Sequence, residues 1–316
     1  MKNIKIGNTD LKVSQINLGG NVFGWTLDEK QSFEILDAFI DNGGNFIDTA
    51  DVYSAWGLGN QGGESETIIG KWLKTRSDRQ NIVVATKVGW DFGDGKRKGL
   101  KPSYIKKAVE DSLRRLQTDQ IDLYYTHIDD GEVPIEDYLG AYADIIAEGK
   151  IKHIAASNVP ADRLIRSLEL GLSGSYPLYK ALQPHYNLVE RETYERDYAP
   201  IVEKFGLTVF PYWSLAAGFL TGKYRSESDL GKSVRGGGLA QYLNEKGFVV
   251  LDALDKVAEK HSTNQAAVAI AWLLSRPYIG APIASATTKN QLDTLFAASN
   301  IQLSMEDLQL LEIASK

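Results

Sequence analysis

The chain has 316 residues, of which 43% are apolar and 24% charged, as is usual for a folded globular protein. Its net charge of −6 excludes the broad basic surface that nonspecific binding to nucleic acid or anionic membranes requires. The absence of cysteine excludes disulfides and thiolate chemistry, and the four histidines lack metal-ligand spacing, so we expect no metal site. The chain has neither a membrane-length apolar run nor a signal core near Met1, which predicts a cytoplasmic protein.

The first element expected is a β-hairpin over Ile4–Ile16, where polar and apolar residues alternate around a turn. Eight short apolar runs typical of strands follow, at Gln15–Leu18, Asn45–Thr49, Ile82–Lys87, Ile121–His127, His153–Ser157, Ala181–Gln183, Thr208–Tyr212 and Ile279–Ile283. Segments of helical period lie between or after them, at Asp28–Asp41, Glu64–Lys74, Pro102–Leu116, Pro134–Ala147, Pro160–Leu170, Phe248–His261, Asn264–Leu274 and Lys289–Ala297.

This alternation predicts an α/β fold with a parallel sheet. About eight units without a break in composition favour one domain over residues 1–316, a closed (β/α)8 TIM barrel with an N-terminal hairpin. The irregular stretch Lys223–Gly247 predicts a long loop after the seventh strand. A loop of this length is either a lid or binding loop or a mobile excursion of the surface.

Polar side chains stand at the carboxyl ends of the predicted strands, where such barrels place their active sites. Asp48 and Tyr53 follow the second run, Lys87 ends the third and His127 ends the fourth. A Lys beside a Tyr favours phenolate and so lowers the pKa of the phenol, which tunes Tyr53 as a proton donor or acceptor. Asp48 would hold the Lys87 ammonium, and His127 would donate to a substrate oxygen. Because none of these residues supplies hydride, the set implies a cofactor.

These residues belong to motifs that resemble the aldo-keto reductase family. The motifs are Leu18–Gly24, Asn45–Ala50 with Tyr53 and Gly63–Glu66, Ser112–Leu116 with Asp119–Tyr124, and Leu220–Tyr224. The resemblance implies a (β/α)8 barrel that binds NAD(P)H and reduces an aldehyde, ketone or sugar-like carbonyl, or oxidises the alcohol. It also implies that Asp48, Tyr53, Lys87 and His127 form the catalytic tetrad, with Tyr53 as the proton donor.

The resemblance further implies a cofactor site at the strand ends. Ser157, Asn158 and Gln183 would bind the carboxamide, and Tyr212 would stack on the nicotinamide. The remaining expected cofactor contacts are Gly20, Asn21, Trp213, Ser214, Leu215, Gly218, Leu220, Lys223, Arg235, Ala284, Ser285, Thr287 and Gln291.

The sequence departs from the family pattern in two places. Trp213-Ser214-Leu215 replaces a common Ser-Pro-Leu, which adds an indole to the cofactor or substrate wall. After the eighth run, an Arg often present near the adenosine 2′-phosphate is missing, and Lys289 supplies the charge. The positions that usually hold the adenine are Thr294 and Leu295. We therefore favour NADP(H) over NAD(H) by a small margin, since NADP selectivity depends on charge-assisted contacts.

Several aromatic side chains follow strand ends and predict an aromatic substrate pocket: Phe23, Trp25, Trp56 and Trp90. His185, just beyond Gln183, could line the same site. The Gly57–Gly62 segment matches a dinucleotide-binding fingerprint, but its distance from the preceding strand favours a flexible loop. The triplet Lys96–Lys98 indicates a solvated loop, or else a contact to an acidic substrate.

Two other functions remain open from the residues. A Schiff-base aldolase or lyase would use Lys87 as its nucleophile but leaves Ser157, Asn158 and Gln183 without a role. A regulatory subunit would keep the cofactor site as a sensor without turnover. In each case the partner is a small molecule, and no nucleic acid or membrane is expected.

Overall fold

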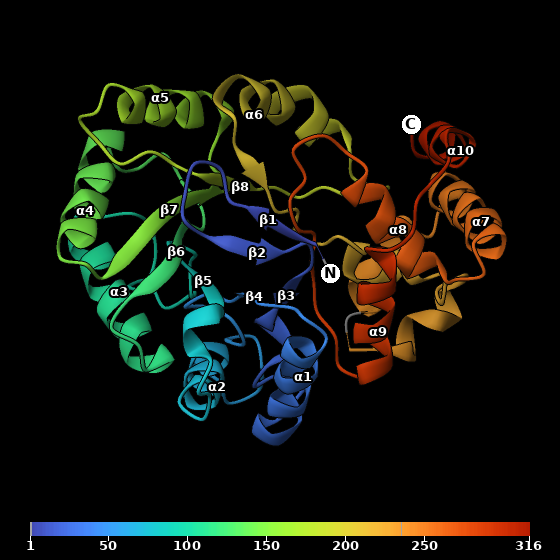
Figure 1. The fold of residues 1–316 in the computed structure, drawn as a ribbon, viewed down its shortest axis with the longest axis horizontal. Coiled ribbons are helices and arrows are strands. Elements are labelled where there is room, and N and C mark those ends of the chain that lie inside the picture. The colour runs from blue at the N-terminus through green and yellow to red at the C-terminus, as the bar shows by residue number, and fades with distance from the viewer. Residues whose placement is uncertain (1, 235) are drawn as a thin grey trace.

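Eight parallel strands form the centre of the computed structural model, which describes residues 2–234 and 236–316 (Figure 1). In spatial order they are β10 (Ile283–Ala284), β3 (Asn17–Gly19), β4 (Phe46–Asp48), β5 (Val83–Val88), β6 (Ile121–Thr126), β7 (Ile151–Ser157), β8 (Ala181–Gln183) and β9 (Thr208–Val209).

Backbone hydrogen bonds join the two ends of this sheet. The N–H of Val209 donates to the carbonyl of Tyr278, Gly280 donates to Val209, and Ile283 donates to Pro211, at 2.8–2.9 Å. These bonds connect β9 to the segment that leads into β10, so the strands close on themselves. The predicted (β/α)8 barrel is confirmed.

Helices surround the strands, as the ring of coils in Figure 1 shows. They are α1 (Glu29–Asp41), α2 (Glu64–Leu73), α3 (Pro102–Leu116), α4 (Ile135–Ala147), α5 (Ala161–Leu172), α6 (Ala199–Phe205), α7 (Glu245–Lys260), α8 (Gln265–Leu274), α9 (Lys289–Ala298) and α10 (Met305–Ser315). Helix α3 illustrates why they form. Pro102 occupies its first turn, Ile105, Val109 and Leu113 recur at helical spacing and are buried, and Gln117 ends it in the left-handed conformation.

The N-terminal hairpin closes the amino end of the barrel. Its strands β1 (Asn3–Lys5) and β2 (Lys12–Ser14) pair antiparallel, and they cross the barrel in Figure 1. Ile6, Leu11 and Val13 pack with inward-facing residues of the barrel, including Phe46 and Leu123. Burial of this apolar layer excludes water from one end, so the opposite end is left for chemistry.

The structure also contains elements that the sequence did not predict. The chain between β8 and β9 forms a π-helix, η3 (Tyr194–Tyr198), that continues into α6, and the C-terminus forms α10. The charge-dense 190–197 stretch and Pro200 concealed the first helix. The second is preceded by a readable signal, because Ser304 and Asp307 form a capping box. Within Lys223–Gly247 the chain forms short 3₁₀ helices, η5 (Glu227–Lys232) and η6 (Gly236–Tyr242).

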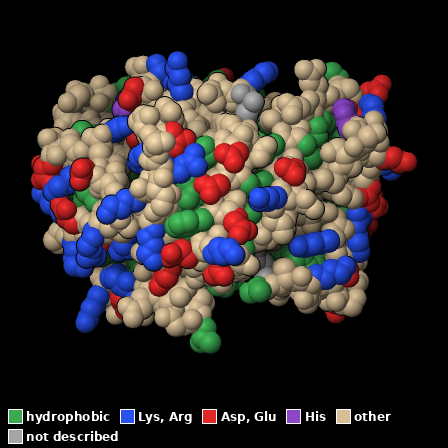
Figure 2. Space-filling view, turned by 60° about the horizontal axis from the view of Figure 1, so that its bottom comes forward, with side chains coloured by type: hydrophobic (Ala, Val, Ile, Leu, Met, Phe, Trp, Pro, Cys, Tyr) green, Lys and Arg blue, Asp and Glu red, His purple; other side chains and the backbone are tan. Residues whose placement is uncertain are grey.

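Charged side chains of both signs are interspersed over the face of the molecule in Figure 2. No large field of one sign dominates that view, in keeping with the modest net charge of −6. In the described part of the chain, no helix combines the length and the hydrophobicity needed to cross a bilayer.

Candidate active site

The alternation of side chains along the strands brings five polar or aromatic residues to one end of the barrel: Lys87, His127, Ser157, Gln183 and Tyr212. On each strand the residue two positions earlier is a buried member of the barrel interior: Ala85, Tyr125, Ala155, Ala181 and Phe210. Because residues two apart share a face of a strand, the later residues point inward as well, at the carboxyl end. Asp48 follows Phe46 on β4 in the same way.

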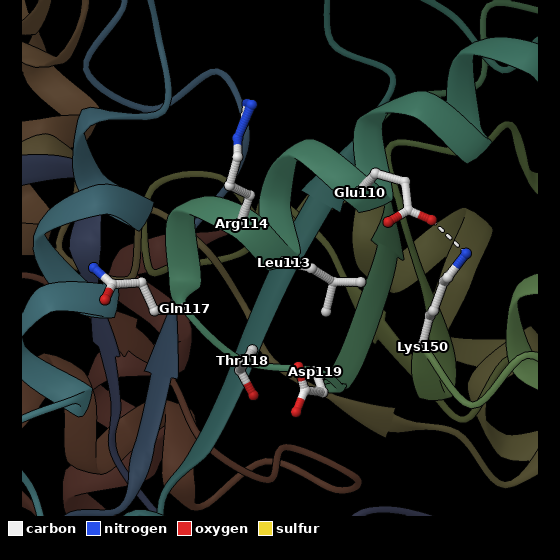
Figure 3. Close-up of a pocket in the computed structure, with 7 residues that line it drawn as sticks. All are labelled: Glu110, Leu113, Arg114, Gln117, Thr118, Asp119 and Lys150. Atoms are coloured by element: carbon white, nitrogen blue, oxygen red, sulfur yellow. Dashed lines mark ion pairs between the residues drawn. The ribbon is translucent and has the colours of Figure 1, made fainter.

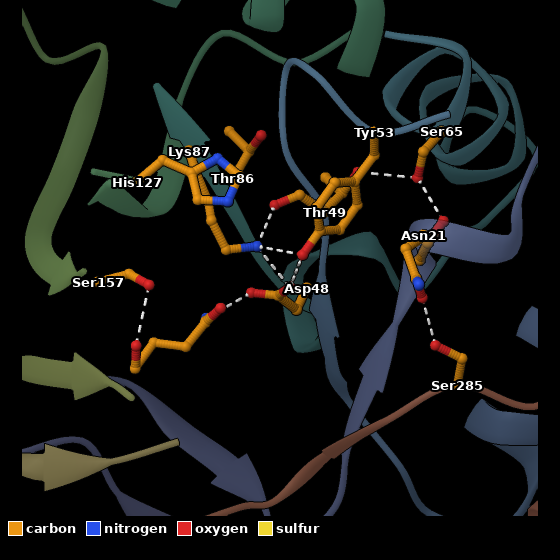
Figure 4. Close-up of polar contacts among 12 residues, drawn as sticks. Asn21, Asp48, Thr49, Tyr53, Ser65, Thr86, Lys87, His127, Ser157 and Ser285 are labelled. Atoms are coloured by element: carbon orange, nitrogen blue, oxygen red, sulfur yellow. Dashed lines mark hydrogen bonds and ion pairs between the residues drawn. The ribbon is translucent and has the colours of Figure 1, made fainter. Parts of the chain in front are cut away.

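Lys87 is the centre of this cluster (Figure 4). Its Nζ donates to Asp48 Oδ2 at 2.6 Å, to the carbonyl of Thr49 at 2.8 Å and to the Tyr53 hydroxyl at 2.9 Å. Lys87 and Asp48 are both 0% exposed. All three N–H bonds of an ammonium are therefore satisfied, and the charge is held against the Tyr53 oxygen.

Burial has the largest effect on the pKa values of Tyr53 and His127. Desolvation, followed by the Asp48 carboxylate, raises the pKa of Tyr53 well above its usual range. This direction is opposite to the expected effect of Lys87, so Tyr53 is a neutral phenol with a proton to give. Desolvation and then Lys87 lower the pKa of His127 well below its usual range, so its imidazole is neutral. His127 Nδ1 is buried and has no hydrogen-bond partner among the described residues.

A second group of hydrogen bonds links the ends of β6, β7 and β8 to Tyr212. Ser157 Oγ donates to the carbonyl of Gln183 at 2.9 Å, and Gln183 Nε2 donates to Asp48 Oδ1 at 2.9 Å. Asn158 Nδ2 donates to the carbonyl of His127 at 2.9 Å, while its Oδ1 accepts from the Tyr212 hydroxyl at 3.0 Å. The structure thus connects the expected carboxamide-binding residues to the tetrad, and it fixes the Tyr212 ring.

His185 packs behind that ring, a contact that the sequence left open. The His185 and Tyr212 rings stack with centroids 5.2 Å apart and an angle of 14° between their planes. Trp213 meets His185 edge to face at 5.2 Å and remains 48% exposed. His185 lies two residues after Gln183, and this spacing was a usable signal for its inward direction.

The backbone after β9 is unusually rich in left-handed residues. Trp213, Ala216, Ala217 and Gly218 have φ values of 53°, 47°, 53° and 109°. Non-glycine residues rarely adopt this conformation, and its recurrence produces a tightly turned loop in which the N–H groups of Ala216 and Gly218 donate to the carbonyls of Trp213 and Leu215. The other expected contacts of this region differ in exposure: Ser214 and Leu220 are buried, Leu215 is half-buried and Lys223 is exposed. Arg235 lies outside the described residues.

The ends of β3 and β10 meet beside the tetrad. Ser285 Oγ donates to Asn21 Oδ1, and Ser65 Oγ, which shares a 2.8 Å hydrogen bond with Thr49 Oγ1, donates to the carbonyl of Gly20. Ser65 connects α2 to the ends of β3 and β4, a role that the sequence did not reveal. Ala284 is buried in β10 itself.

At the start of α9 the chain forms a capped helix end. The side chain of Thr288 accepts from the N–H of Gln291, and Gln291 Oε1 accepts from the N–H of Thr287 at 2.7 Å. Lys289 is exposed at this end. Leu295 is 2% exposed and packs in the core.

Three of the four predicted pocket aromatics lie around the tetrad. Trp56 is 5.9 Å from Tyr53 between ring centroids, and Trp90 is 5.0 Å from His127. Trp25 meets Trp56 edge to face at 5.7 Å. Phe23, in contrast, is 0% exposed within the hydrophobic core, so the prediction that it lines a pocket is wrong.

The two remaining motifs belong to loops at the same end of the barrel. The glycine-rich Gly57–Gly62 segment lies in a loop between β4 and α2, where Asn60 Nδ2 donates to the carbonyls of Gly24 and Ser54. The tight strand–turn–helix of a dinucleotide fingerprint is absent there. In the basic triplet, Arg97 pairs with Asp94 and donates to the carbonyl of Gln61, which ties two loops together.

A separate surface hollow lies near the C-terminal end of α3 (Figure 3). It is lined by Glu110, Leu113, Arg114, Gln117, Thr118, Asp119 and Lys150. Thr118 and Asp119 immediately precede β6, whereas His127 follows it. The hollow is therefore at the opposite end of the strand from the tetrad.

Comparison with known proteins identifies the family. Residues 15–316 match the model of the Aldo/keto reductase family, and the chain belongs to it. It is 33% identical to the "Uncharacterized oxidoreductase YrpG" of Bacillus subtilis (strain 168), over 97% of this chain and 93% of that protein. It is also 33% identical to the "Aryl-alcohol dehydrogenase [NADP(+)]" of Phanerodontia chrysosporium, over 95% of this chain and 82% of that protein. The protein is thus an oxidoreductase of a family that acts on carbonyls with nicotinamide cofactors.

Proposed function

We propose that the protein is an NADPH-dependent reductase of aromatic aldehydes or ketones, with Tyr53 as the proton donor. The observation that carries this proposal is the contact of the Tyr53 hydroxyl with the buried Lys87 ammonium at 2.9 Å. A neutral phenol held against a cation can give up its proton, because the ammonium stabilises the charge that develops on the oxygen. Asp48 fixes the ammonium, and neutral His127 donates a hydrogen bond to the substrate oxygen.

The residues beside the tetrad fit a nicotinamide cofactor. Tyr212 is fixed by Asn158 and backed by His185, so one flat face is held in place for another ring. Ser157, Asn158 and Gln183 place amide and hydroxyl groups next to it. When bound, the cofactor supplies hydride to the carbonyl carbon, while Tyr53 supplies the proton to the oxygen.

The preference for NADPH rests on the start of α9. Lys289, Thr287 and Gln291 place one cation and two polar side chains at a helix N-terminus, which suits a 2′-phosphate. One similar protein is named for NADP(+). Lys289→Ala should weaken NADPH binding about fivefold, the effect of one exposed ion pair, and leave NADH binding unchanged. Equal loss for both cofactors would contradict this assignment.

The aromatic substrate class rests on Trp56 and Trp90. Both indoles are partly exposed, at 49% and 41%, and both contact tetrad rings. Exposed aromatic surface at a reaction centre favours planar apolar substrates. Trp90→Ala should raise KM for a benzaldehyde more than for a small aliphatic aldehyde. We also propose that residues 1–316 form a single domain and that the partner of the protein is a small molecule.

The deciding experiment measures cofactor binding and turnover separately. Quenching of protein fluorescence by NADPH reports binding, and loss of reduced-nicotinamide absorbance with an aryl aldehyde reports reduction. Tyr53→Phe should bind NADPH normally but lose kcat by about 10²–10⁴-fold, the range of a proton donor. Retained turnover would remove Tyr53 from the mechanism, and binding without turnover by the unaltered protein would favour a sensor. Covalent trapping of substrate on Lys87 by borohydride would favour the aldolase.

A further inference from the structure

Asp51 is a buried carboxyl group beside the candidate active site to which the proposed reaction gives no role. The residue is 3% exposed, and neither side-chain oxygen has a hydrogen-bond partner among the described residues. Its N–H donates to the carbonyl of Lys87 at 3.3 Å, so its position is fixed next to the residue that contacts Tyr53. An ionised carboxylate in such surroundings, without partners, costs several kcal/mol.

The charged groups of α2 and α3 that act on Asp51, Glu66 and Arg115, are already paired with each other. Glu66 is fully buried and accepts from Arg115 Nε at 2.6 Å and from Thr86 Oγ1 at 2.6 Å. Arg115 is thus bound to Glu66, and a second carboxylate at Asp51 would be a like charge beside it. This arrangement opposes ionisation of Asp51.

The groups on the other sides of Asp51 offer little stabilisation to an ionised carboxylate. From β5, Lys87 directs its three N–H bonds to other acceptors. From α3 and β6 come Tyr104 and Tyr124, two phenols whose pKa values burial raises. Arg115, the N–H of Val52 and Lys87 act in the opposite direction, but desolvation and then Glu66 raise the pKa of Asp51 well above its usual range.

We propose that Asp51 is a positioning residue that remains an un-ionised carboxylic acid in the working enzyme and so preserves the full effect of Lys87 on Tyr53. The inference rests on the proposed reduction. As Tyr53 donates its proton to the carbonyl oxygen, negative charge develops on the phenol oxygen, and the Lys87 ammonium stabilises it. A carboxylate at Asp51 would oppose this stabilisation. Loss of the Asp51 proton to solvent as the pH rises should therefore slow reduction.

Infrared spectroscopy tests the protonation directly, without cofactor or substrate. The unaltered protein at neutral pH should show a protonated-carboxyl C=O stretch that Asp51→Asn lacks and that disappears as the pH is raised. Asp122 provides a matched control, because it is 4% exposed but accepts from Lys152 Nζ at 2.7 Å and from the N–H of Val84 at 3.0 Å. Asp122→Asn should remove no such band. If the spectrum of Asp51→Asn lacks this difference, the proposal is overturned, whether or not the protein reduces carbonyls.

The pH dependence of kcat tests the effect on the reaction. Asp51→Asn keeps the size and neutrality of the carboxylic acid, so its kcat at neutral pH should lie within about twofold of the unaltered enzyme. At alkaline pH the unaltered enzyme should lose activity in a step that the variant lacks, with the Kd for NADPH unchanged in both. An identical pH profile, or a folded variant more than about tenfold slower at neutral pH, would show that Asp51 does not act in this way.

Discussion

Replacement of Lys87 by methionine would test how much of the buried Asp48–Lys87 pair serves stability and how much serves reactivity. The change removes the cation but keeps an unbranched chain of similar length. Asp48 is left 0% exposed and without its ionic partner. Removal of one member of a buried pair costs about 3–5 kcal/mol. Asp48 still accepts from Gln183 at 2.9 Å and from Tyr53 at 3.2 Å, so we expect a loss near the lower limit, about 3 kcal/mol.

The double variant Asp48→Asn with Lys87→Met removes both charges. It should recover most of the lost stability, because no uncompensated carboxylate remains, but it should stay inactive. Urea unfolding of the four proteins in the cycle gives the coupling energy, and aldehyde reduction gives the activity. A Lys87→Met protein as stable as the original, or a double variant less stable than either single one, would refute the reasoning from burial.

Three further predictions concern binding, pH and the C-terminal helix. Tyr212→Phe removes the hydrogen bond to Asn158 at 3.0 Å, so the Kd for NADPH measured by fluorescence quenching should rise by about twofold to tenfold; an unchanged Kd would contradict it. Because the pKa of His127 is lowered, the unfolded chain binds a proton below pH 6.5 that the folded protein does not. The free energy of unfolding of the unaltered protein, measured in urea, should therefore fall by about 1.4 kcal/mol more between pH 7.5 and 5.5 than that of His127→Asn. Equal decreases in the two proteins would count against a neutral His127. Arg191 is 6% exposed at its side chain and donates to Glu312 of α10, which is 29% exposed, at 2.8 Å. Arg191→Met should lower the free energy of unfolding by about 1.5–3 kcal/mol, the value of a hydrogen bond to a charged group, and speed proteolysis near the C-terminus. Resistance to proteolysis equal to that of the original protein would show that α10 docks without Arg191.

The sequence by itself determined the architecture, because the signals that define it are local. Alternating apolar runs and helical periods predicted the barrel, and α3 was predicted to the residue. The position of Lys87, His127 and Gln183 at the carboxyl ends of the apolar runs predicted that they would meet at one end of the barrel. The π-helix at Tyr194 escaped because its charge-dense segment gives weak periodicity, whereas helix α10 escaped although the capping box of Ser304 and Asp307 precedes it.

The tertiary structure decided what depends on burial and on contacts distant in sequence. The order of residues could not show that Phe23 is enclosed in the core, that His185 stacks on Tyr212, or that Ser65 bridges two strand ends. The direction of the Tyr53 pKa is the clearest case. The sequence emphasised the nearby Lys87, which lowers that pKa, whereas the folded protein also removes Tyr53 from water and places Asp48 against it. Desolvation depends on everything that surrounds a group, and only the complete fold specifies those surroundings.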